Sequence, residues 1–477
     1  MPFVSRNPAN NQVVRTFPSI APAELHAALG RAQAAGNDWR WTDFETRAQL
    51  MTKLADLMRE RKHELAGLIT LEMGKLAREA IAEIEKCALG CDYYAVHAGP
   101  FLQEEPIYTD AGRSYVAYQP LGTVLAIMPW NFPFWQAFRF TAPAIMAGNA
   151  VVLKHASNVP QCALAIEKLF KDAGFPENLF VTLLLDAALV EEAIASPLVH
   201  AVTLTGSEEA GRKVGAAAGA HLKKCVLELG GSDSFIVLAD ADLDLATTQA
   251  VVGRFQNCGQ SCIAAKRFIV VPQIAEEFVA LFKAKTEALK IGDPTREDTQ
   301  LGPMARRDLV EELHAQVRDS IAAGARPVTG CAPMGGEGDY YRPSLLDHVP
   351  PASRAWQEEL FGPVASIIRA KDEDEAVAVA NATRFGLGAS LWSRDFARAE
   401  KLGERVEAGM IFINGIVKSD PRLPFGGIKE SGYGRELSYH GIREFVNAKT
   451  VWIKDRAPHL GEERRQQEDR RRADRRS

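Results

Sequence analysis

The sequence predicts an α/β protein in which parallel sheets are covered on both faces. Two observations lead to this fold class. From about residue 123 onwards, short runs that are apolar at every position alternate with segments of helical spacing. Strands in a parallel sheet that is buried on both faces have this continuous apolar character. The first hundred residues instead show helical periodicity, so helices are expected to precede the sheets.

The elements follow in order along the chain. Apolar residues recur every three to four positions from Arg47 to Leu65, which predicts one helix, and a second helix is expected from about Glu72 to Val96. Residues 114–119 alternate as a half-buried strand does. The further strands expected from apolar runs are 124–128, 150–153, 201–204, 235–238, 268–271, 366–368 and 410–413.

Length and composition limit the kind of protein. A chain of 477 residues exceeds one simple core, so two or three domains are expected. The net charge of −5 argues against nucleic acid or an anionic membrane as a partner. No apolar stretch reaches about 18 residues, so no membrane span is expected, and the N-terminus lacks a signal-peptide pattern. Seven scattered cysteines without metal-ligand spacing favour free thiols in a cytoplasmic protein with no metal site.

Five motifs, in a fixed order, carry the chemistry. They are 129–133 (PWNFP), 227–231 (LELGG), 255–262 (FQNCGQSC), 358–363 (EELFGP) and 424–429 (PFGGIK), the last followed by Ser431-Gly432 and Gly434-Arg435-Glu436. Together they resemble the signature motifs of the aldehyde dehydrogenase family, and the resemblance extends from about residue 5 to 455. It implies the family's fold: a Rossmann-like cofactor domain, an α/β catalytic domain and a small β arm for oligomerisation.

The resemblance also implies catalytic roles. Cys262 would be the nucleophile that forms a thioester, and Glu228 the general base that hydrolyses it. These roles agree with the chemistry, because an aldehyde needs a nucleophile before it can release hydride, and a thiolate is a strong one. The side-chain amide of Asn131 and the backbone N–H of Cys262 would stabilise the oxyanion. The carboxylate at 228 favours hydrolysis over transfer of the acyl group to coenzyme A, and the presence of both Cys262 and Glu228 argues against a non-catalytic relative.

The expected cofactor is NAD or NADP. Residues 204–211 follow a strand and open a helix, whose N-terminus offers backbone donors to a phosphate. By resemblance, the cofactor site comprises Trp130, Lys154, Ser157, Gly206, Ser207, Leu229, Glu359 and Phe361. Ser157 stands where family members often have a glutamate that would repel a 2′-phosphate. NADP is therefore not excluded, and the preference between the two cofactors stays open.

Residues 127–133, 153–156 and 227–233 resemble those of bacterial succinate-semialdehyde dehydrogenases. Succinate semialdehyde has a remote carboxylate that needs a cationic or hydrogen-bonding anchor. Arg139 is the first candidate and Ser419 the second, while a structural ion pair is the alternative for Arg139. Gln256 stands where some members have a second arginine. The alternative is therefore a broader enzyme that also accepts glutarate semialdehyde or uncharged aldehydes.

The expected domains follow the family pattern. They are a cofactor domain at 1–107 and 128–228, a catalytic domain at 229–440, and an arm at 108–127 and 441–456. The arm would assemble a homodimer or homotetramer. The charged segment 461–477 is expected to be disordered. Cys258 is either a packing residue or the partner of Cys262 in a reversible disulfide.

Overall fold

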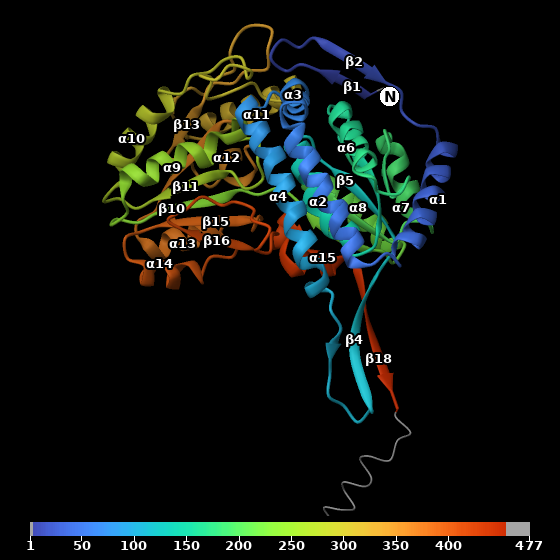
Figure 1. Cartoon of the computed structure of the whole chain (residues 1–477). Helices are drawn as coiled ribbons and strands as arrows, with labels where there is room; N and C mark the ends of the chain where they lie inside the picture. Colours follow the sequence, from blue (N-terminus) through green and yellow to red (C-terminus); the bar gives the residue numbers. More distant parts are fainter. Residues whose placement is uncertain (1–2, 455–477) are drawn as a thin grey trace, which may run out of the picture.

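Two α/β bodies and a thin arm make up the structure, a computed structural model that describes residues 3–454 (Figure 1). The first body surrounds a six-stranded sheet in which only β17 runs antiparallel to its neighbour. In spatial order its strands are β17 (Gly432–Tyr433), β9 (Lys224–Glu228), β8 (Ala201–Thr205), β5 (Thr123–Met128), β6 (Ala150–His155) and β7 (Phe180–Thr182).

Helices cover both faces of this sheet. Alternate residues of β5 face opposite ways: Val124 and Ala126 belong to one apolar cluster, and Leu125 belongs to another on the other face. The first cluster involves α2 (Phe44–Glu60), α3 (Lys62–Met73), α4 (Ala77–Phe101), α5 (Pro133–Met146), α6 (Pro160–Ala173) and α15 (Ser438–Glu444). The second involves α1 (Pro22–Trp39), α7 (Val190–Ala195) and α8 (Glu208–Ala220). The continuous apolar character of these strands therefore has the predicted cause.

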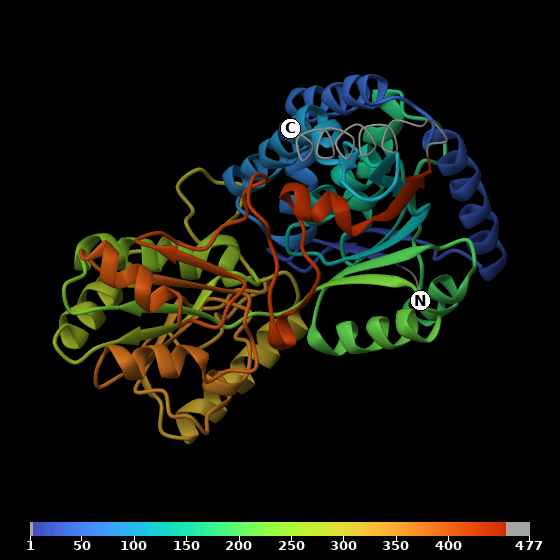
Figure 2. The same cartoon turned by 90° about the horizontal axis from the view of Figure 1, so that it is seen from below.

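The second body is built around a seven-stranded sheet, again parallel except at one edge. Its strands are β12 (Arg326–Thr329), β13 (Ser344–Asp347), β14 (Val364–Arg369), β11 (Ala265–Val270), β10 (Asp233–Val237), β15 (Gly388–Trp392) and β16 (Met410–Ile413). Its helices are α9 (Leu243–Phe255), α10 (Ala275–Glu287), α11 (Arg307–Ala322), α12 (Arg354–Gln357), α13 (Glu373–Asn381) and α14 (Phe396–Gly403). Figure 2 shows the two bodies side by side, with chain crossing between them.

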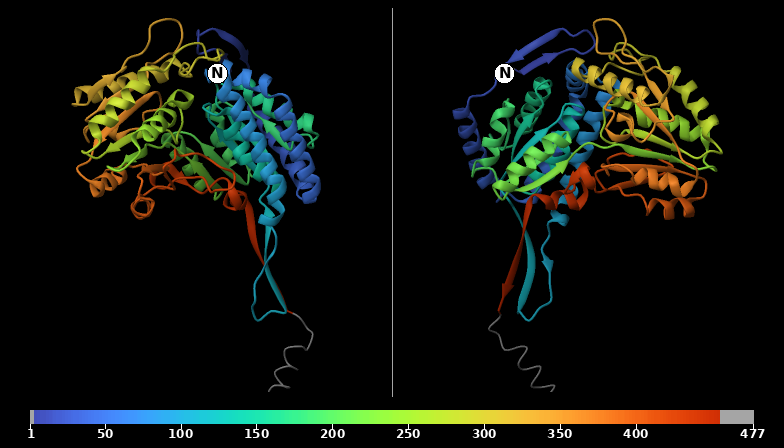
Figure 3. Two further views of the ribbon diagram at one scale, coloured as in Figure 1. Left: turned by 60° about the vertical axis from the view of Figure 1, so that its left-hand side comes forward. Right: turned by 180° about the vertical axis from the view of Figure 1, so that it is seen from behind.

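The arm extends away from both bodies (Figure 3). It pairs β18 (Val446–Ile453) with β4 (Arg113–Pro120), and β4 with β3 (Glu105–Pro106), all antiparallel. A hairpin of β1 (Phe3–Arg6) and β2 (Val13–Phe17) lies near α3 and α6. The range 108–127 expected for the arm also takes in most of β5, which pairs with β6 and β8 in the six-stranded sheet.

The predicted domain boundaries remain a prediction. The short strand β17 falls inside the range 229–440 expected for the catalytic domain, yet it pairs with β9 of the first body. The charged segment 461–477 lies outside the described residues. Within the part of the chain that the structure describes, no helix has the length and apolar character needed to cross a membrane.

Two helix boundaries differ from the prediction. The single helix expected from Arg47 to Leu65 is divided between α2 and α3, because Arg61 adopts a non-helical ψ of 13°. The next helix begins at Ala77 and not at Glu72, because Gly74 ends α3 in the left-handed conformation, with a φ of 75°. A side chain there would begin 2.6 Å from the ring of Pro303, so a glycine is required at this turn.

Candidate active site

The loop that carries Cys262 has a strained backbone held by one buried arginine. Asn257 and Cys258 both have a φ of 53°, which residues with side chains rarely adopt. The guanidinium of Arg254, at the end of α9, donates to the carbonyl of Gly259 at 2.6 Å and to that of Gly362 at 2.7 Å. These bonds tie the loop before Cys262 to the loop that carries Glu359 and Phe361.

Lys266 holds the loop from the other side. Its Nζ, buried at the start of β11, donates to the carbonyls of Ser261 and Cys262, both at 2.8 Å, and lies 2.9 Å from Oε1 of Glu359. Among the described residues no carbonyl accepts the backbone N–H of Cys262. That N–H is therefore available to an oxygen atom on a bound molecule.

Asn131 lies at the end of β5 and faces the same space. Its Nδ2 donates to the carbonyl of Gln260 at 3.1 Å, which leaves the second N–H of the amide free. Asn257 fixes the backbone of Asn131 by donating to its carbonyl at 2.8 Å. Asn131 and Cys262 line the same cavity, so an amide donor and a backbone N–H lie in one site.

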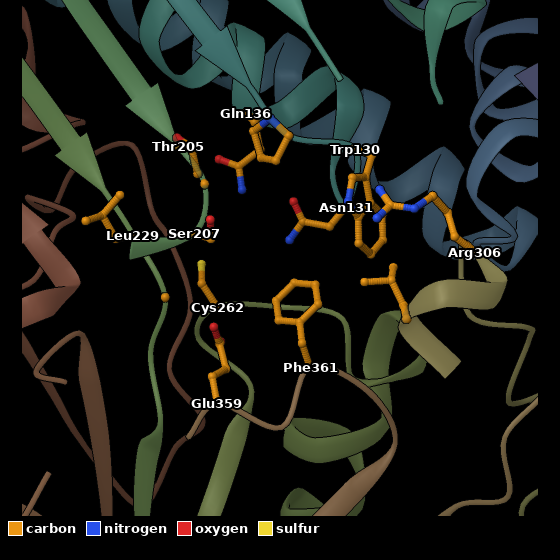
Figure 4. A pocket seen from close by; sticks show the side chains of 14 residues that line it. Trp130, Asn131, Gln136, Thr205, Ser207, Leu229, Cys262, Arg306, Glu359 and Phe361 are labelled. Atoms are coloured by element: carbon orange, nitrogen blue, oxygen red, sulfur yellow. The ribbon is translucent and has the colours of Figure 1, made fainter. Parts of the chain in front are cut away.

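A cavity of about 370 Å³, which we call the cofactor cavity, opens beside Cys262. In Figure 4 the side chains of Cys262, Asn131, Glu359 and Phe361 surround a common space. Eight of the residues expected at the catalytic and cofactor sites line it: Trp130, Asn131, Gly206, Ser207, Leu229, Cys262, Glu359 and Phe361. Strands β5, β8 and β9 all present their carboxyl ends here, which is where open α/β sheets bind ligands.

The cofactor cavity fits a dinucleotide. Ser207 caps the N-terminus of the 13-residue helix α8, and its hydroxyl accepts the N–H of Ala210 at 3.3 Å. The acidic Glu208 in the first turn is paired with Arg384 at 2.9 Å, so its charge is compensated. Backbone donors of such a helix end suit a diphosphate. The rings of Trp130 and Phe361 meet edge to face at 5.7 Å and form an apolar wall.

Glu359 forms another wall of the same cavity. Its carboxylate packs directly on Gly230, where a side chain would begin only 2.5 Å from Oε2. The ion pair with Lys266 fixes the carboxylate, although burial raises the pKa of this group. An oriented carboxylate is a suitable acceptor for ribose hydroxyls.

Lys154 and Ser157, also expected at the cofactor site, lie outside the cofactor cavity. They lie at the carboxyl end of β6, the strand next to β5, and neither lines the cofactor cavity. Ser157 is exposed, and burial lowers the pKa of Lys154. His155 between them, to which no role was assigned, is buried and bonded through Nε2 to the carbonyl of Pro133 at 2.8 Å. Burial lowers the pKa of His155 to about 4, so this imidazole is neutral and joins β6 to α5.

Of the two titratable candidates for catalysis, Glu228 is buried and Cys262 is partly buried. Burial raises the pKa of Cys262 to about 12, although Arg139 and Lys266 act in the opposite direction. Burial, and secondly the neighbouring Glu436, raise the pKa of Glu228 well above its usual range. Glu228 lines neither the cofactor cavity nor the second cavity on the other side of Cys262. Its Oε1 packs against Gly426 instead. Its carboxyl oxygens have no hydrogen-bond partner among the described residues.

A second, smaller cavity of about 120 Å³ lies on the other side of Cys262, and we call it the substrate cavity. It shares Cys262 and Gln136 with the cofactor cavity, so the sulfur stands where the two meet. Both predicted anchors, Arg139 and Ser419, line it, and so does Gln256. Burial also raises the pKa of Cys258, which belongs to the core of the second body and not to either cavity.

Sequence reasoning missed several residues of the site. Lys266 and Arg254 could have been noticed, because each is a charge within an otherwise apolar segment. Gln136 could have been noticed as well, because it lies on the almost entirely apolar helix α5. Lys86 carried no such signal, since polar residues are common on its helix α4. Lys86 reaches the substrate cavity from α4, far from every motif in the sequence.

Comparisons with known proteins agree with this geometry. Residues 2–451 match the model of the aldehyde dehydrogenase family. A probable succinate-semialdehyde dehydrogenase [NADP(+)] from Synechocystis sp. is 52% identical, over 95% of this chain and 100% of its own length. A succinate-semialdehyde dehydrogenase [NADP(+)] from Mycobacterium ulcerans is 51% identical, with the same coverage.

A solved structure agrees as well. The succinic semialdehyde dehydrogenase from Streptococcus pyogenes, in complex with NADP+, superposes with a TM-score of 0.93 at 37% identity, covering 95% of this chain and 100% of the other. The expected fold is thereby confirmed, and the chain belongs to the aldehyde dehydrogenase family.

Proposed function

We propose that this protein oxidises succinate semialdehyde to succinate, with NADP or NAD as the hydride acceptor. The observation that carries the proposal is the position of Cys262 between a cavity that fits a dinucleotide and a cavity lined by cations. The substrate cavity includes Lys86, Arg139 and Lys418 but no carboxylate side chain. Such a lining favours an aldehyde that is itself an anion. The names of the relatives support the same substrate.

The first half of the reaction takes place at Cys262. Its thiol loses a proton, and the thiolate adds to the aldehyde carbon, which places a negative charge on the former carbonyl oxygen. The amide of Asn131 and the backbone N–H of Cys262 donate to this oxygen. One such donor contributes roughly 2.7–4 kcal/mol in a transition state. A bound NADP or NAD supplies the acceptor for the hydride, and the acyl group then remains on Cys262 as a thioester.

Glu228 completes the reaction by taking a proton from the water that attacks the thioester. In the structure its carboxyl lies beside Gly426 and Glu436. To act on the thioester, the side chain rotates about its torsions until the carboxyl faces Cys262. Its raised pKa makes it a stronger base than an exposed glutamate once it is ionised. The products are the free acid and the regenerated thiol.

NADP is the proposed preferred cofactor. Ser157, two residues after the end of β6, offers a hydroxyl and no negative charge to a 2′-phosphate, and Lys154, within β6, offers a positive charge. The names of the relatives from Synechocystis and M. ulcerans specify NADP(+). A carboxylate in place of Ser157 would repel the phosphate.

Assembly and location complete the proposal. The arm leaves Trp452 and Tyr108 exposed, and Trp452 lies on β18, the edge strand of the arm. An exposed aromatic residue on an edge strand favours pairing with a second copy. A homodimer or homotetramer is the expected state. All seven cysteines are free, and an enzyme that depends on a thiol needs a reducing compartment, which favours the cytoplasm.

The test compares two aldehydes of equal chain length. Initial rates of NADPH or NADH formation are measured with succinate semialdehyde and with butanal, which lacks the carboxylate. The expected kcat/KM for succinate semialdehyde exceeds that for butanal by roughly ten-fold or more, because a charge-assisted hydrogen bond contributes about 1.5–3 kcal/mol. Equal values for the two aldehydes would refute the substrate assignment but not the oxidation of aldehydes.

A further inference from the structure

Two of the cations that line the substrate cavity, the buried Arg139 and the partly buried Lys86, have different contacts. Arg139, from α5, and Lys86, from α4, both line it. The cavity itself brings no carboxylate near them. The charge that a substrate carboxylate meets therefore depends on what each cation contacts outside the cavity.

Arg139 is already neutralised. Its Nε is ion-paired with Glu436, and the side chains of both residues are only 2% exposed. Its Nη2 donates to the hydroxyl of Thr205 at 3.3 Å, and its guanidinium lies 4.3 Å from the centre of the Phe425 ring. A second carboxylate at Arg139 would have to approach a pair whose net charge is near zero, with Glu436 repelling it.

Lys86 is not neutralised. Within residues 3–454 no carboxylate lies within ion-pairing distance of its Nζ. The ammonium donates to the hydroxyl of Ser419 at 2.5 Å and lies 4.4 Å from the centre of the Trp135 ring. Burial and the nearby Arg139 lower the pKa of Lys86 to about 8, and the more distant carboxylates of Glu83 and Asp420 offset only part of this effect. A bound carboxylate would supply the missing counter-ion.

We propose that Lys86, together with the hydroxyl of Ser419, binds the remote carboxylate of the substrate and is the residue that determines specificity for an acidic aldehyde. This inference rests on the proposed function and deepens it. Gln256 lines the same cavity and is uncharged. Lys418 also lines the cavity, but it is exposed to solvent. Lys86 therefore provides, from a helix in the first body, the partly buried positive charge that neither Gln256 nor the paired Arg139 offers.

The distribution of apolar residues supports this orientation of the substrate. Phe132, Trp135 and Phe425 line the cavity together with these polar groups. A short methylene chain suits such walls, with the aldehyde at Cys262 and the carboxylate at Lys86 and Ser419.

The test uses three variants: Lys86→Met, which removes the charge at nearly constant length, Lys86→Arg, which keeps it, and Lys283→Met, a matched control on the exposed side of α10. KM and kcat are measured for succinate semialdehyde and butanal with saturating NADP. For Lys86→Met, KM for succinate semialdehyde is expected to rise roughly ten- to hundred-fold, as for loss of one charge-assisted hydrogen bond. Its kinetic constants for butanal stay within about twofold of the unmodified enzyme, which also shows that the variant is folded. Lys86→Arg restores most of the preference, and Lys283→Met changes nothing.

The outcomes separate the two proposals. If the unmodified enzyme prefers succinate semialdehyde over butanal and Lys86→Met keeps that preference, the assignment to Lys86 is wrong while the proposed function stands. An unmodified enzyme without any preference overturns both. A Lys86→Met variant that loses activity equally on both aldehydes shows a structural role for Lys86 and also overturns the inference.

Discussion

The two cavities that meet at Cys262 are built in different ways. The cofactor cavity is formed mainly by turns at the ends of β5, β8 and β9, where glycines and backbone groups determine the shape. The substrate cavity combines side chains from α4, α5 and the loop 416–419 with residues of the loop that carries Cys262. Backbone turns leave motifs that can be recognised in the sequence, whereas a cluster of distant side chains does not. Changes at each cavity are therefore expected to affect different kinetic constants.

Cys262 lines both cavities, so its replacement is expected to cause the largest loss of activity. The Cys262→Ser variant is expected to lose roughly 10⁴-fold or more in kcat, because the hydroxyl cannot replace the thiolate. Binding of NADP, followed by protein fluorescence, stays close to that of the unmodified enzyme. The control is Cys331→Ser, at a free thiol that lines neither cavity. Residual turnover within tenfold of normal would rule out Cys262 as the nucleophile.

Glu228 separates the two halves of the reaction. In Glu228→Gln the first turnover proceeds, but hydrolysis slows by about 10²–10⁴-fold, the usual contribution of a general base. Rapid mixing would then show a burst of one NADPH per active site followed by a slow phase. In the unmodified enzyme, hydrolysis accelerates as the pH rises through the raised pKa of Glu228, because only the ionised form accepts a proton. Absence of a burst in the variant would contradict the assigned role.

Substitution of Ser157 tests the part of the cofactor site expected to hold the 2′-phosphate, and a smaller change in kinetic constants is expected. The Ser157→Glu variant places a carboxylate beside the expected 2′-phosphate, and KM for NADP should rise about ten- to hundred-fold through repulsion. KM for NAD and KM for succinate semialdehyde should hardly change. Ser157→Ala is the matched control. A parallel rise in the KM values for NADP and NAD would show that the position does not contact the phosphate.

The sequence predicted well what the local chain determines. Strand β16 has the predicted bounds, and β5, β6, β8, β11 and β14 lie within a few residues of theirs. These five are buried along almost their whole length, and strands buried on both faces are mainly apolar, whereas β16 is a partly exposed edge strand. The helix boundaries at Arg61 and Gly74 were wrong, since apolar periodicity continues across both positions. Gly74 is a typical helix-ending residue, but the prediction gave more weight to the apolar periodicity that continues past it.

The candidate site divides in the same way. Residues in motifs, such as Asn131 and Phe361, were placed in the cavity from sequence. The ion pair of Arg139 with Glu436 could not be predicted from the sequence, because the two residues are nearly three hundred positions apart and only the fold brings them together. Lys86 on an amphipathic helix looks like any solvated lysine, and only the packing of α4 against α5 reveals its burial.

The central claim is that a succinyl group is carried by Cys262, and it can be observed directly. Glu228→Gln is mixed with succinate semialdehyde and NADP, quenched in acid, digested and analysed by mass spectrometry. The account predicts one succinyl group on the peptide that holds Cys262, located at Cys262 and not at Cys258, formed only when NADP is present and lost on treatment with hydroxylamine. A peptide that stays unmodified while NADPH is formed, or a succinyl group on another residue, would contradict it.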